Sequence, residues 1–178
     1  MKNAGPGKKL LIVVDMQNDF ITGTLGSPQA VRIVSAVNAK IERYKQNGDK
    51  VLFTRDTHFD NYMDTQEGTY LPVVHCVKGT GGHLIADELN TTGCEIFDKL
   101  TFGSLELAKD IAAGDFDAIE LCGLCTDICI VSNALILKAQ LPETKITVDA
   151  GCCAGVTEES HQAALLTMKM CQVSVTEE

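Results

Sequence analysis

The sequence has little positive charge and no long apolar run. Its 15 lysine and arginine residues are outnumbered by 24 aspartate and glutamate residues, which gives a formal net charge of −9. A basic surface for nucleic acid is therefore missing, and an anionic membrane would repel the chain. The apolar run from Leu10 to Val14 ends at Asp15 and is too short for a signal sequence or a membrane-spanning helix. We expect a cytoplasmic protein that binds a small neutral or cationic molecule.

Linkers, repeats and low-complexity segments are also absent, so we expect one domain spanning residues 1–178. The 45% hydrophobic content is sufficient for a sizeable core. A chain of this size folds without disulfides, and we interpret its eight cysteines as reduced thiols. Cys122 and Cys125 form a C-x-x-C pair, but no second pair completes a four-thiolate zinc site. Cys76, Cys152 and Cys153 are expected to fill the core.

Short β-branched runs alternate with helical patterns along the chain. The expected strands are residues 10–14, 50–54, 95–97, 118–122, 145–148 and 172–175. The expected helices lie between Ser27 and Asn47 and at residues 104–113, 127–139 and 157–170. This alternation predicts an α/β fold, with a doubly wound, mostly parallel sheet and helices on both faces. Residues 57–82 lack periodicity, and a loop of that length is usually functional.

Polar and reactive side chains follow the expected strands. Asp15 ends the first strand, Asp56 and His58 follow the second, Lys99 follows the third and Cys129 follows the fourth. The binding crevice of an open parallel sheet lies at the carboxyl ends of its strands. We therefore expect these side chains to lie at one edge of the sheet.

Cys129 is the candidate nucleophile. The fourth expected strand breaks at Gly123 and the chain continues in a helical pattern, which places Cys129 in the first turn of a helix. Unpaired amides there lower the pKa of a thiol and can receive an oxyanion. The alternative is a buried cysteine that serves only as a small hydrophobe.

A cysteine nucleophile needs a base, and a charge that holds the base in place. Asp15 and Lys99 offer these groups at neighbouring strand ends. The alternative interpretations are a turn residue for Asp15 and a solvated surface charge for Lys99. The common position of the three residues favours a reactive site.

Several motifs, in this order, resemble those of the isochorismatase-like cysteine hydrolases, and most of all those of the nicotinamidases. They are residues 11–20 (LIVVDMQNDF), 56–58 (DTH), 75–80 (HCVKGT), 99–104 (KLTFGS) and 123–129 (GLCTDIC). The resemblance extends from Leu10 to about Leu166, nearly the whole chain.

The resemblance implies a catalytic triad of Asp15, Lys99 and Cys129. Asp15 would accept the thiol proton and later pass it to departing ammonia, while Lys99 keeps the carboxylate ionised and in place. Cys129 would attack an amide carbonyl to give a thioester that water hydrolyses. The resemblance also implies a cis peptide bond between Leu124 and Cys125, with the N–H groups of Cys125 and Cys129 donating to the oxyanion.

Asp56, His58 and His75 form a second group, one carboxylate and two imidazoles, which suits zinc, iron or manganese. Each residue alone would be interpreted as a turn aspartate or a surface histidine. Two of the four histidines, however, fall where nicotinamidases carry metal ligands. Glu67 is a candidate fourth ligand, either direct or through water. We expect a divalent metal, with zinc favoured over iron or manganese.

The chain departs from the nicotinamidases because it contains no tryptophan. Nicotinamidases commonly place a tryptophan before the second metal histidine, where it stacks on the pyridine ring. Phe20, Tyr70 or Leu71 is expected to form the apolar wall instead. His83 and His161 match no ligand position, and we expect them on a loop surface and a helix surface.

The expected activity is hydrolysis of a small carboxamide, with nicotinamide first. One alternative is a relative that acts on a carbamoyl or ureido compound without a metal, and another is a catalytically silent binding protein on this fold. True isochorismatase activity is disfavoured because vinyl-ether hydrolysis needs no cysteine nucleophile. The resemblance also leads us to expect a homo-oligomer.

Overall fold

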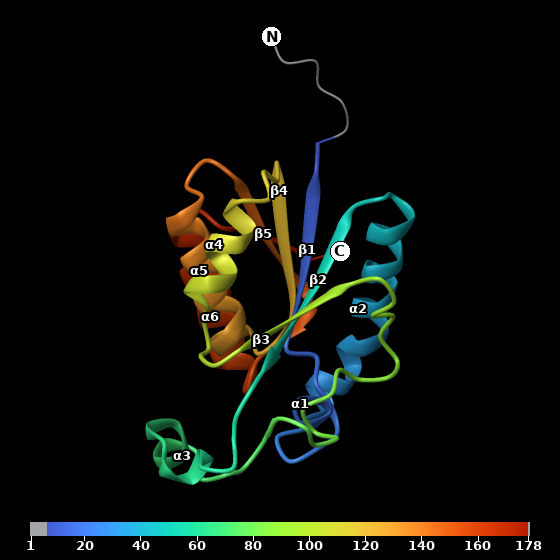
Figure 1. Ribbon diagram of the computed structural model, residues 1–178. Coiled ribbons are helices and arrows are strands. Elements are labelled where there is room, and N and C mark those ends of the chain that lie inside the picture. The colour runs from blue at the N-terminus through green and yellow to red at the C-terminus, as the bar shows by residue number, and fades with distance from the viewer. Residues whose placement is uncertain (1–6, 178) are drawn as a thin grey trace.

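Six parallel strands form the centre of the protein in a computed structural model that describes residues 7–177 (Figure 1). The order across the sheet is β3-β2-β1-β4-β5-β6, and each neighbouring pair is parallel. The strands are β1 (Lys9–Val14), β2 (Lys50–Asp56), β3 (Glu95–Lys99), β4 (Ala118–Leu124), β5 (Lys145–Ala154) and β6 (Ser174–Thr176). The predicted doubly wound parallel sheet is confirmed.

Helices cover both faces of this sheet (Figure 1). The long helix α2 (Pro28–Gln46) lies on one face, and the other face carries α4 (Leu105–Ala112), α5 (Val131–Gln140) and α6 (Glu158–Met170). Hydroxyl side chains cap three of these helices, because Ser27, Ser104 and Thr157 each accept a hydrogen bond from a backbone N–H of the first turn. None of the helices within residues 7–177 combines the length and the apolar character needed to cross a membrane.

Several elements differ in extent from the sequence expectation. Strands β2 and β3 each run two residues further than predicted, so Asp56 and Lys99 are the last residues of strands and pair with each other in register. The backbone pairing between β2 and β3 continues beyond the last apolar residues of both strands, which the sequence pattern does not show. Three short helical segments were not predicted: α1 (Asn18–Ile21), η1 (Tyr62–Asp64) and α3 (Gln66–Tyr70). The helix expected at residues 127–139 is present, but its first turn is the π turn η2 (Thr126–Ile130).

The winding of the sheet reverses beside β1. The chain passes from β1 to β2 on one side, while β4 pairs with β1 on the other. Gly123 lies next to Val14 in this pairing at φ 117°, where a Cβ atom would stand 2.2 Å from the Val14 carbonyl oxygen. Only glycine permits this approach. The reversal and the close contact bring the ends of β1 and β4 together, at the position where α/β sheets bind ligands.

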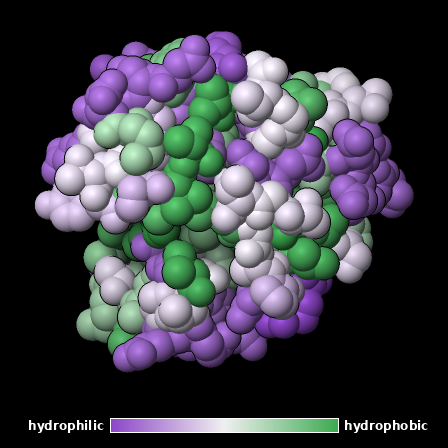
Figure 2. All heavy atoms as spheres, turned by 90° about the horizontal axis from the view of Figure 1, so that it is seen from below, coloured by the Kyte–Doolittle hydropathy of each residue, from purple (hydrophilic) through white to green (hydrophobic). Residues whose placement is uncertain are grey.

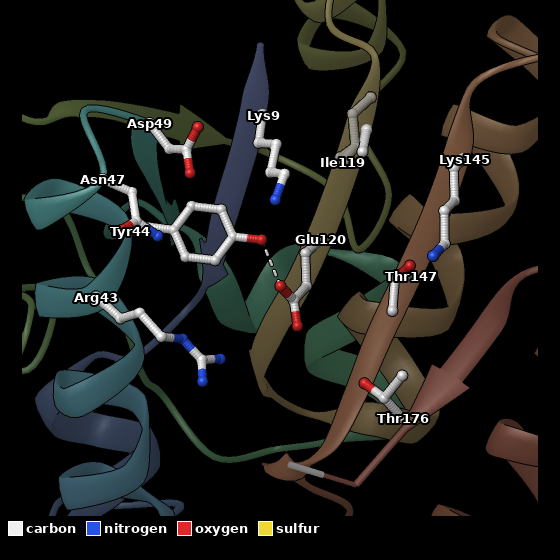
Figure 3. A pocket seen from close by; sticks show the side chains of 11 residues that line it. Lys9, Arg43, Tyr44, Asn47, Asp49, Ile119, Glu120, Lys145, Thr147 and Thr176 are labelled. Carbon is white, nitrogen blue, oxygen red and sulfur yellow. Dashed lines mark hydrogen bonds between the residues drawn. The ribbon is translucent and has the colours of Figure 1, made fainter. Parts of the chain in front are cut away.

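The opposite edge of the sheet holds a buried polar network beside a cavity of about 290 Å³ (Figure 3). Tyr44 donates a hydrogen bond to Glu120 on the cavity wall. Behind it, the Nζ atom of Lys40 lies 2.6 Å from Glu120 Oε1 and 2.5 Å from Asp149 Oδ2. The Lys40 side chain is only 3% exposed, and that of Asp149 is fully buried. One ammonium group thus lies between two carboxylates across α2, β4 and β5.

Replacing Lys40 by alanine should lower the free energy of unfolding by about 3–5 kcal/mol, because it leaves buried carboxylates without their cation. The control is Lys50→Ala, which removes an exposed ion pair with Glu95 and should cost less than about 1 kcal/mol. Urea denaturation measures both. A Lys40→Ala protein as stable as the Lys50→Ala protein would contradict this account.

Candidate active site and metal centre

The ammonium group of Lys99 lies at the centre of the residues that the sequence singled out. Its Nζ atom is 2.7 Å from Asp15 Oδ2, 3.1 Å from Asp56 Oδ1 and 3.4 Å from Cys129 Sγ. Each of these residues is at most 4% exposed. The structure therefore brings the predicted base, cation and thiol together at the carboxyl edge of the sheet. The surface interpretation of Lys99 is excluded.

Asp15 is held in place by the strand beside it. The residue directly follows β1 and has a left-handed backbone with φ 49°, which is uncommon outside glycine. The Thr54 hydroxyl donates a 2.6 Å hydrogen bond to Asp15 Oδ1, and it also accepts one from the Asp15 N–H. Sequence reasoning missed Thr54. The only available signal was its position on the expected second strand, two residues before Asp56.

Cys129 lies in the π turn η2, directly before α5. The Ile130 N–H donates to the Cys125 carbonyl oxygen across this turn, and the Asn133 side chain donates a 2.7 Å hydrogen bond to the Cys129 carbonyl oxygen. Turns of this type inside helices are frequent at functional sites. The Leu124–Cys125 peptide bond that precedes the turn is cis, as the family resemblance implied.

The expected lowering of the Cys129 pKa is wrong. Burial raises the pKa of this thiol well above its usual value, and the Asp15 carboxylate adds to the effect while Lys99 opposes it. Burial likewise raises the pKa of Asp15, again with Lys99 opposing. One ammonium group faces two carboxylates here, so a further negative charge on sulfur is disfavoured. The raised pKa makes the resting group a thiol, and its sulfur accepts a hydrogen bond from Lys99, which also contacts Asp15.

The second predicted group is also assembled. Asp56, His58, Glu67 and His75 each direct one ligand atom to a common point, and these atoms lie within 4.8 Å of one another. His58 Nε2 is 3.0 Å from Asp56 Oδ2 and 3.5 Å from Glu67 Oε1, and His75 Nε2 is 3.7 Å from each of the same oxygens. Ligands about 2.1 Å from a tetrahedral ion stand about 3.4 Å apart, which is close to these separations.

Hydrogen bonding and packing orient the imidazole rings of His58 and His75 for metal binding. The Nδ1 atom of His75 lies 2.7 Å from the Val73 carbonyl oxygen, which can only accept, so its Nε2 lone pair faces the cluster. The buried Nε2 atom of His58 has no well-aligned hydrogen bond. The ring of Tyr62, which sequence reasoning missed, packs edge-on against both imidazoles. The four residues fit a divalent metal ion.

Charge at this cluster also favours a cation. Burial opposes protonation of His58, but the Asp56 and Glu67 carboxylates outweigh it and raise its pKa to about 9. Burial similarly opposes ionisation of Asp56, yet His58 and Lys99 lower its pKa to about 2. The cluster therefore attracts positive charge, and a metal ion would take the place of the proton on His58.

One cavity of about 480 Å³ connects the thiol to this cluster. Its lining includes Cys129, Asp56 and His75, together with the predicted wall residues Phe20, Tyr70 and Leu71. Leu124 of the cis peptide also lines it, and further apolar lining comes from residues that sequence reasoning missed: Leu25, Phe102, Ile128 and Val156. Viewed toward the carboxyl edge of the sheet, hydrophobic side chains run across the surface (Figure 2). The volume and apolar character suit a small organic ligand.

The expectation of surface positions for His83 and His161 is wrong. His83 is 2% exposed and its Nε2 atom lies 2.9 Å from the Thr57 hydroxyl, while His161 is 9% exposed with Nδ1 2.7 Å from the Thr126 hydroxyl. In each ring a threonine hydroxyl satisfies one of the two nitrogens, which lowers the cost of burial. The expected burial of Cys76 is confirmed.

Comparison with known proteins agrees with this geometry. The model of the isochorismatase domain family matches residues 9–178. The chain belongs to this family. A nicotinamidase of Saccharomyces cerevisiae is 27% identical over 187 residues, covering 79% of this chain and 86% of that protein.

Two solved structures extend the comparison. The pyrazinamidase of Pyrococcus horikoshii in complex with zinc has a TM-score of 0.85 and 27% identity, covering 96% of this chain and 99% of the other. The N-carbamoylsarcosine amidase of Thermoplasma acidophilum has a TM-score of 0.79 and 25% identity, covering 96% of each chain. The isochorismatase-like fold of this chain is thus shared by amidases of more than one kind.

The raised pKa of Cys129 predicts a specific alkylation profile. The rate at which iodoacetamide alkylates Cys129 should still increase above about pH 9. For a thiol with the usual pKa of about 8.5, the rate would level off near that pH. Asp15→Asn removes a like charge, so the pH dependence of alkylation should move to lower pH. Mass spectrometry of the peptide that carries Cys129 gives the rates, with exposed Asp64→Asn as the control. A plateau below about pH 8 in the unaltered protein would contradict this assignment.

Proposed function

We propose that this family member is a cysteine amidohydrolase that converts nicotinamide and water to nicotinate and ammonia. The observation that carries the proposal is the shared cavity, which is lined both by the thiol of Cys129 and by the Asp56 and His75 members of the metal cluster. The nicotinamidase and pyrazinamidase relatives support the same choice of substrate class.

In the first half-reaction, Asp15 takes the thiol proton as Cys129 Sγ bonds to the amide carbonyl carbon. Asp15 then gives this proton to the amide nitrogen, the C–N bond breaks, and ammonia leaves a thioester behind. The N–H groups of Cys125 and Cys129 are the proposed donors to the oxyanion. Lys99, 2.7 Å from Asp15, keeps the carboxylate ionised and oriented.

In the second half-reaction, Asp15 removes a proton from water as the water oxygen attacks the thioester carbon. The C–S bond breaks, the acid is released, and the thiolate recovers its proton from Asp15. Each cycle therefore needs only the amide and one water molecule. The raised pKa of Asp15 suits a group that must both accept and return a proton.

Asp56, His58, His75 and Glu67 would hold the divalent metal, and we propose zinc. When bound, the ion would act as a Lewis acid that also accepts a pyridine nitrogen, which would orient the ring-bound carboxamide toward Cys129. Phe20, Tyr70 and Leu71 are the proposed apolar wall for the ring.

A carbamoyl or ureido substrate is the second candidate. The absence of tryptophan and the shared fold with N-carbamoylsarcosine amidase favour it. A silent binding protein is disfavoured because Asp15, Lys99 and Cys129 are assembled within contact distance. A homo-oligomeric state and a cytoplasmic location remain predictions from the sequence.

Ammonia release tests the substrate and the nucleophile together. Nicotinamide should be hydrolysed much faster than benzamide, which lacks the ring nitrogen. Cys129→Ala should abolish turnover with the fold intact, whereas Cys171→Ala changes an exposed thiol and should retain activity. Equal rates on nicotinamide and benzamide would overturn the ring-nitrogen arrangement, and normal turnover by Cys129→Ala would overturn the triad.

Metal analysis tests the second cluster. The purified protein should hold about one equivalent of divalent metal per chain, as a single ligand set implies. His58→Ala should lose this metal, while Asp64→Ala, which removes an exposed carboxylate from the same loop, should retain it. Full activity in metal-free protein would instead favour the carbamoyl or ureido substrate class.

A further inference from the structure

Gln17 is a fully buried polar residue to which the proposed reaction gives no part. Its Nε2 atom donates hydrogen bonds to the Asp56 carbonyl oxygen at 2.9 Å and to the His83 carbonyl oxygen at 3.0 Å. Its Oε1 atom accepts a 2.7 Å hydrogen bond from the Asp56 N–H. Both N–H donors and the oxygen acceptor of the Gln17 amide therefore form hydrogen bonds, and these bonds join the backbone at Asp56 to the backbone at His83.

These hydrogen bonds lie where the pairing between β1 and β2 ends. β2 pairs with β1 only as far as the Val13 and Phe53 partners, and β1 ends at Val14. The β2 strand continues to Asp56, whose N–H and C=O groups would otherwise face the end of β1 without partners. The Gln17 amide offers one N–H and one C=O to them, the same two groups that successive peptide units of a parallel strand would offer.

Asp56 has little freedom to move. Its Oδ1 atom lies 3.1 Å from Lys99 Nζ, while its Oδ2 atom lies 3.0 Å from His58 Nε2. One carboxylate thus serves both the triad and the metal cluster. A small displacement of the Asp56 backbone would disturb both sets of contacts.

Asp19 holds the other metal-ligand segment in a similar way. Its Oδ2 atom accepts a 2.8 Å hydrogen bond from the N–H of Cys76, the residue after His75, and its own N–H donates to the Gly82 carbonyl oxygen. The ring of Phe20 packs against the His75 imidazole with centroids 5.5 Å apart. The segment after Asp15 therefore contacts both backbone segments that carry buried ligands.

We propose that Gln17 is a positioning residue whose amide takes the place of the missing β1 backbone groups and fixes Asp56 between Lys99 and the metal cluster, with Asp19 fixing His75. The effect on metal binding rests on the proposed metal centre. The effect on the Asp56 backbone does not, because the hydrogen bonds to Gln17 are independent of any ion.

The test compares Zn²⁺ affinities, measured by chelator competition. Gln17→Leu removes all of the hydrogen bonds at similar volume and should weaken Zn²⁺ binding by about 10–100-fold, as for other residues that orient metal ligands. Asn18→Ala removes the neighbouring bond to the Gly81 carbonyl oxygen, which holds no ligand, and should leave the affinity within about threefold. Val37→Ala, a core change in α2, controls for a general loss of stability.

Two substitutions of Asp19 test whether its oxygen acceptor is what matters for Zn²⁺ affinity. Asp19→Asn keeps an oxygen acceptor for the Cys76 N–H and should retain most of the Zn²⁺ affinity, whereas Asp19→Ala should lose it. If Gln17→Leu does not fold, Gln17→Glu keeps the acceptor but loses both donors and should still weaken Zn²⁺ binding. Unchanged Zn²⁺ affinity in a folded Gln17 variant would overturn the proposal.

Hydrogen exchange separates this proposal from the proposed function. The backbone amide of Asp56 should exchange faster in Gln17→Leu than in Val37→Ala at matched stability, whether or not metal binds. An unaltered protein that binds no Zn²⁺ would refute the metal centre alone, and the exchange rate would then decide the role of Gln17. Equal protection of the Asp56 amide in these two variants would refute that role.

Discussion

The buried ammonium group of Lys99 is the interaction on which the rest of the site depends. It is 1% exposed and contacts Asp15, Asp56 and the Cys129 sulfur, which come from the ends of β1, β2 and the turn after β4. Without this cation, two carboxylates would lie buried beside each other at a cost of several kcal/mol, on the order of that for a broken buried ion pair. Lys99 therefore stabilises the arrangement that the proposed chemistry uses.

Lys99 only partly offsets the groups that keep the thiol of Cys129 protonated at rest. The negative charge of two neighbouring carboxylates exceeds the positive charge of Lys99, so burial and charge together keep the proton on Cys129. Activation must then come from proton transfer to Asp15 during attack. Asp56 links this triad to the metal cluster, because its two oxygens face Lys99 and His58. A cation bound at the cluster would offset the charge of Asp56 next to the triad.

Much of this arrangement could be predicted from the sequence. The alternation of strands and helices gives a parallel sheet, and residues placed after its strands must meet at one edge. Asp15, Lys99, Cys129, Asp56 and His58 were located in this way, whereas His75 was identified from its match to a ligand position of the nicotinamidases, and all six lie together. The roles of Glu67 and of the cis peptide depended on the family resemblance, because local pattern does not reveal either.

Other features could not be predicted because they arise from three-dimensional neighbours. The pKa of Cys129 was predicted in the wrong direction because the helix-entry position does not reveal the burial of the thiol, which is the main cause of its raised pKa, or the Asp15 and Asp56 carboxylates that add to it. The partners of Gln17 and Thr54 could not be predicted, since their side chains bond to backbone and carboxyl groups about forty residues away. The burial of His83 likewise depends on a distant threonine hydroxyl.

The central claim is that Cys129 carries the acyl group during amide hydrolysis. Acid quenching during steady-state turnover of nicotinamide, followed by proteolysis and mass spectrometry, tests it most directly. The account predicts a nicotinoyl thioester on the peptide that contains Cys129 and no adduct on the other cysteine peptides. Turnover without any acylated cysteine, or with the acyl group on a different cysteine, would contradict it.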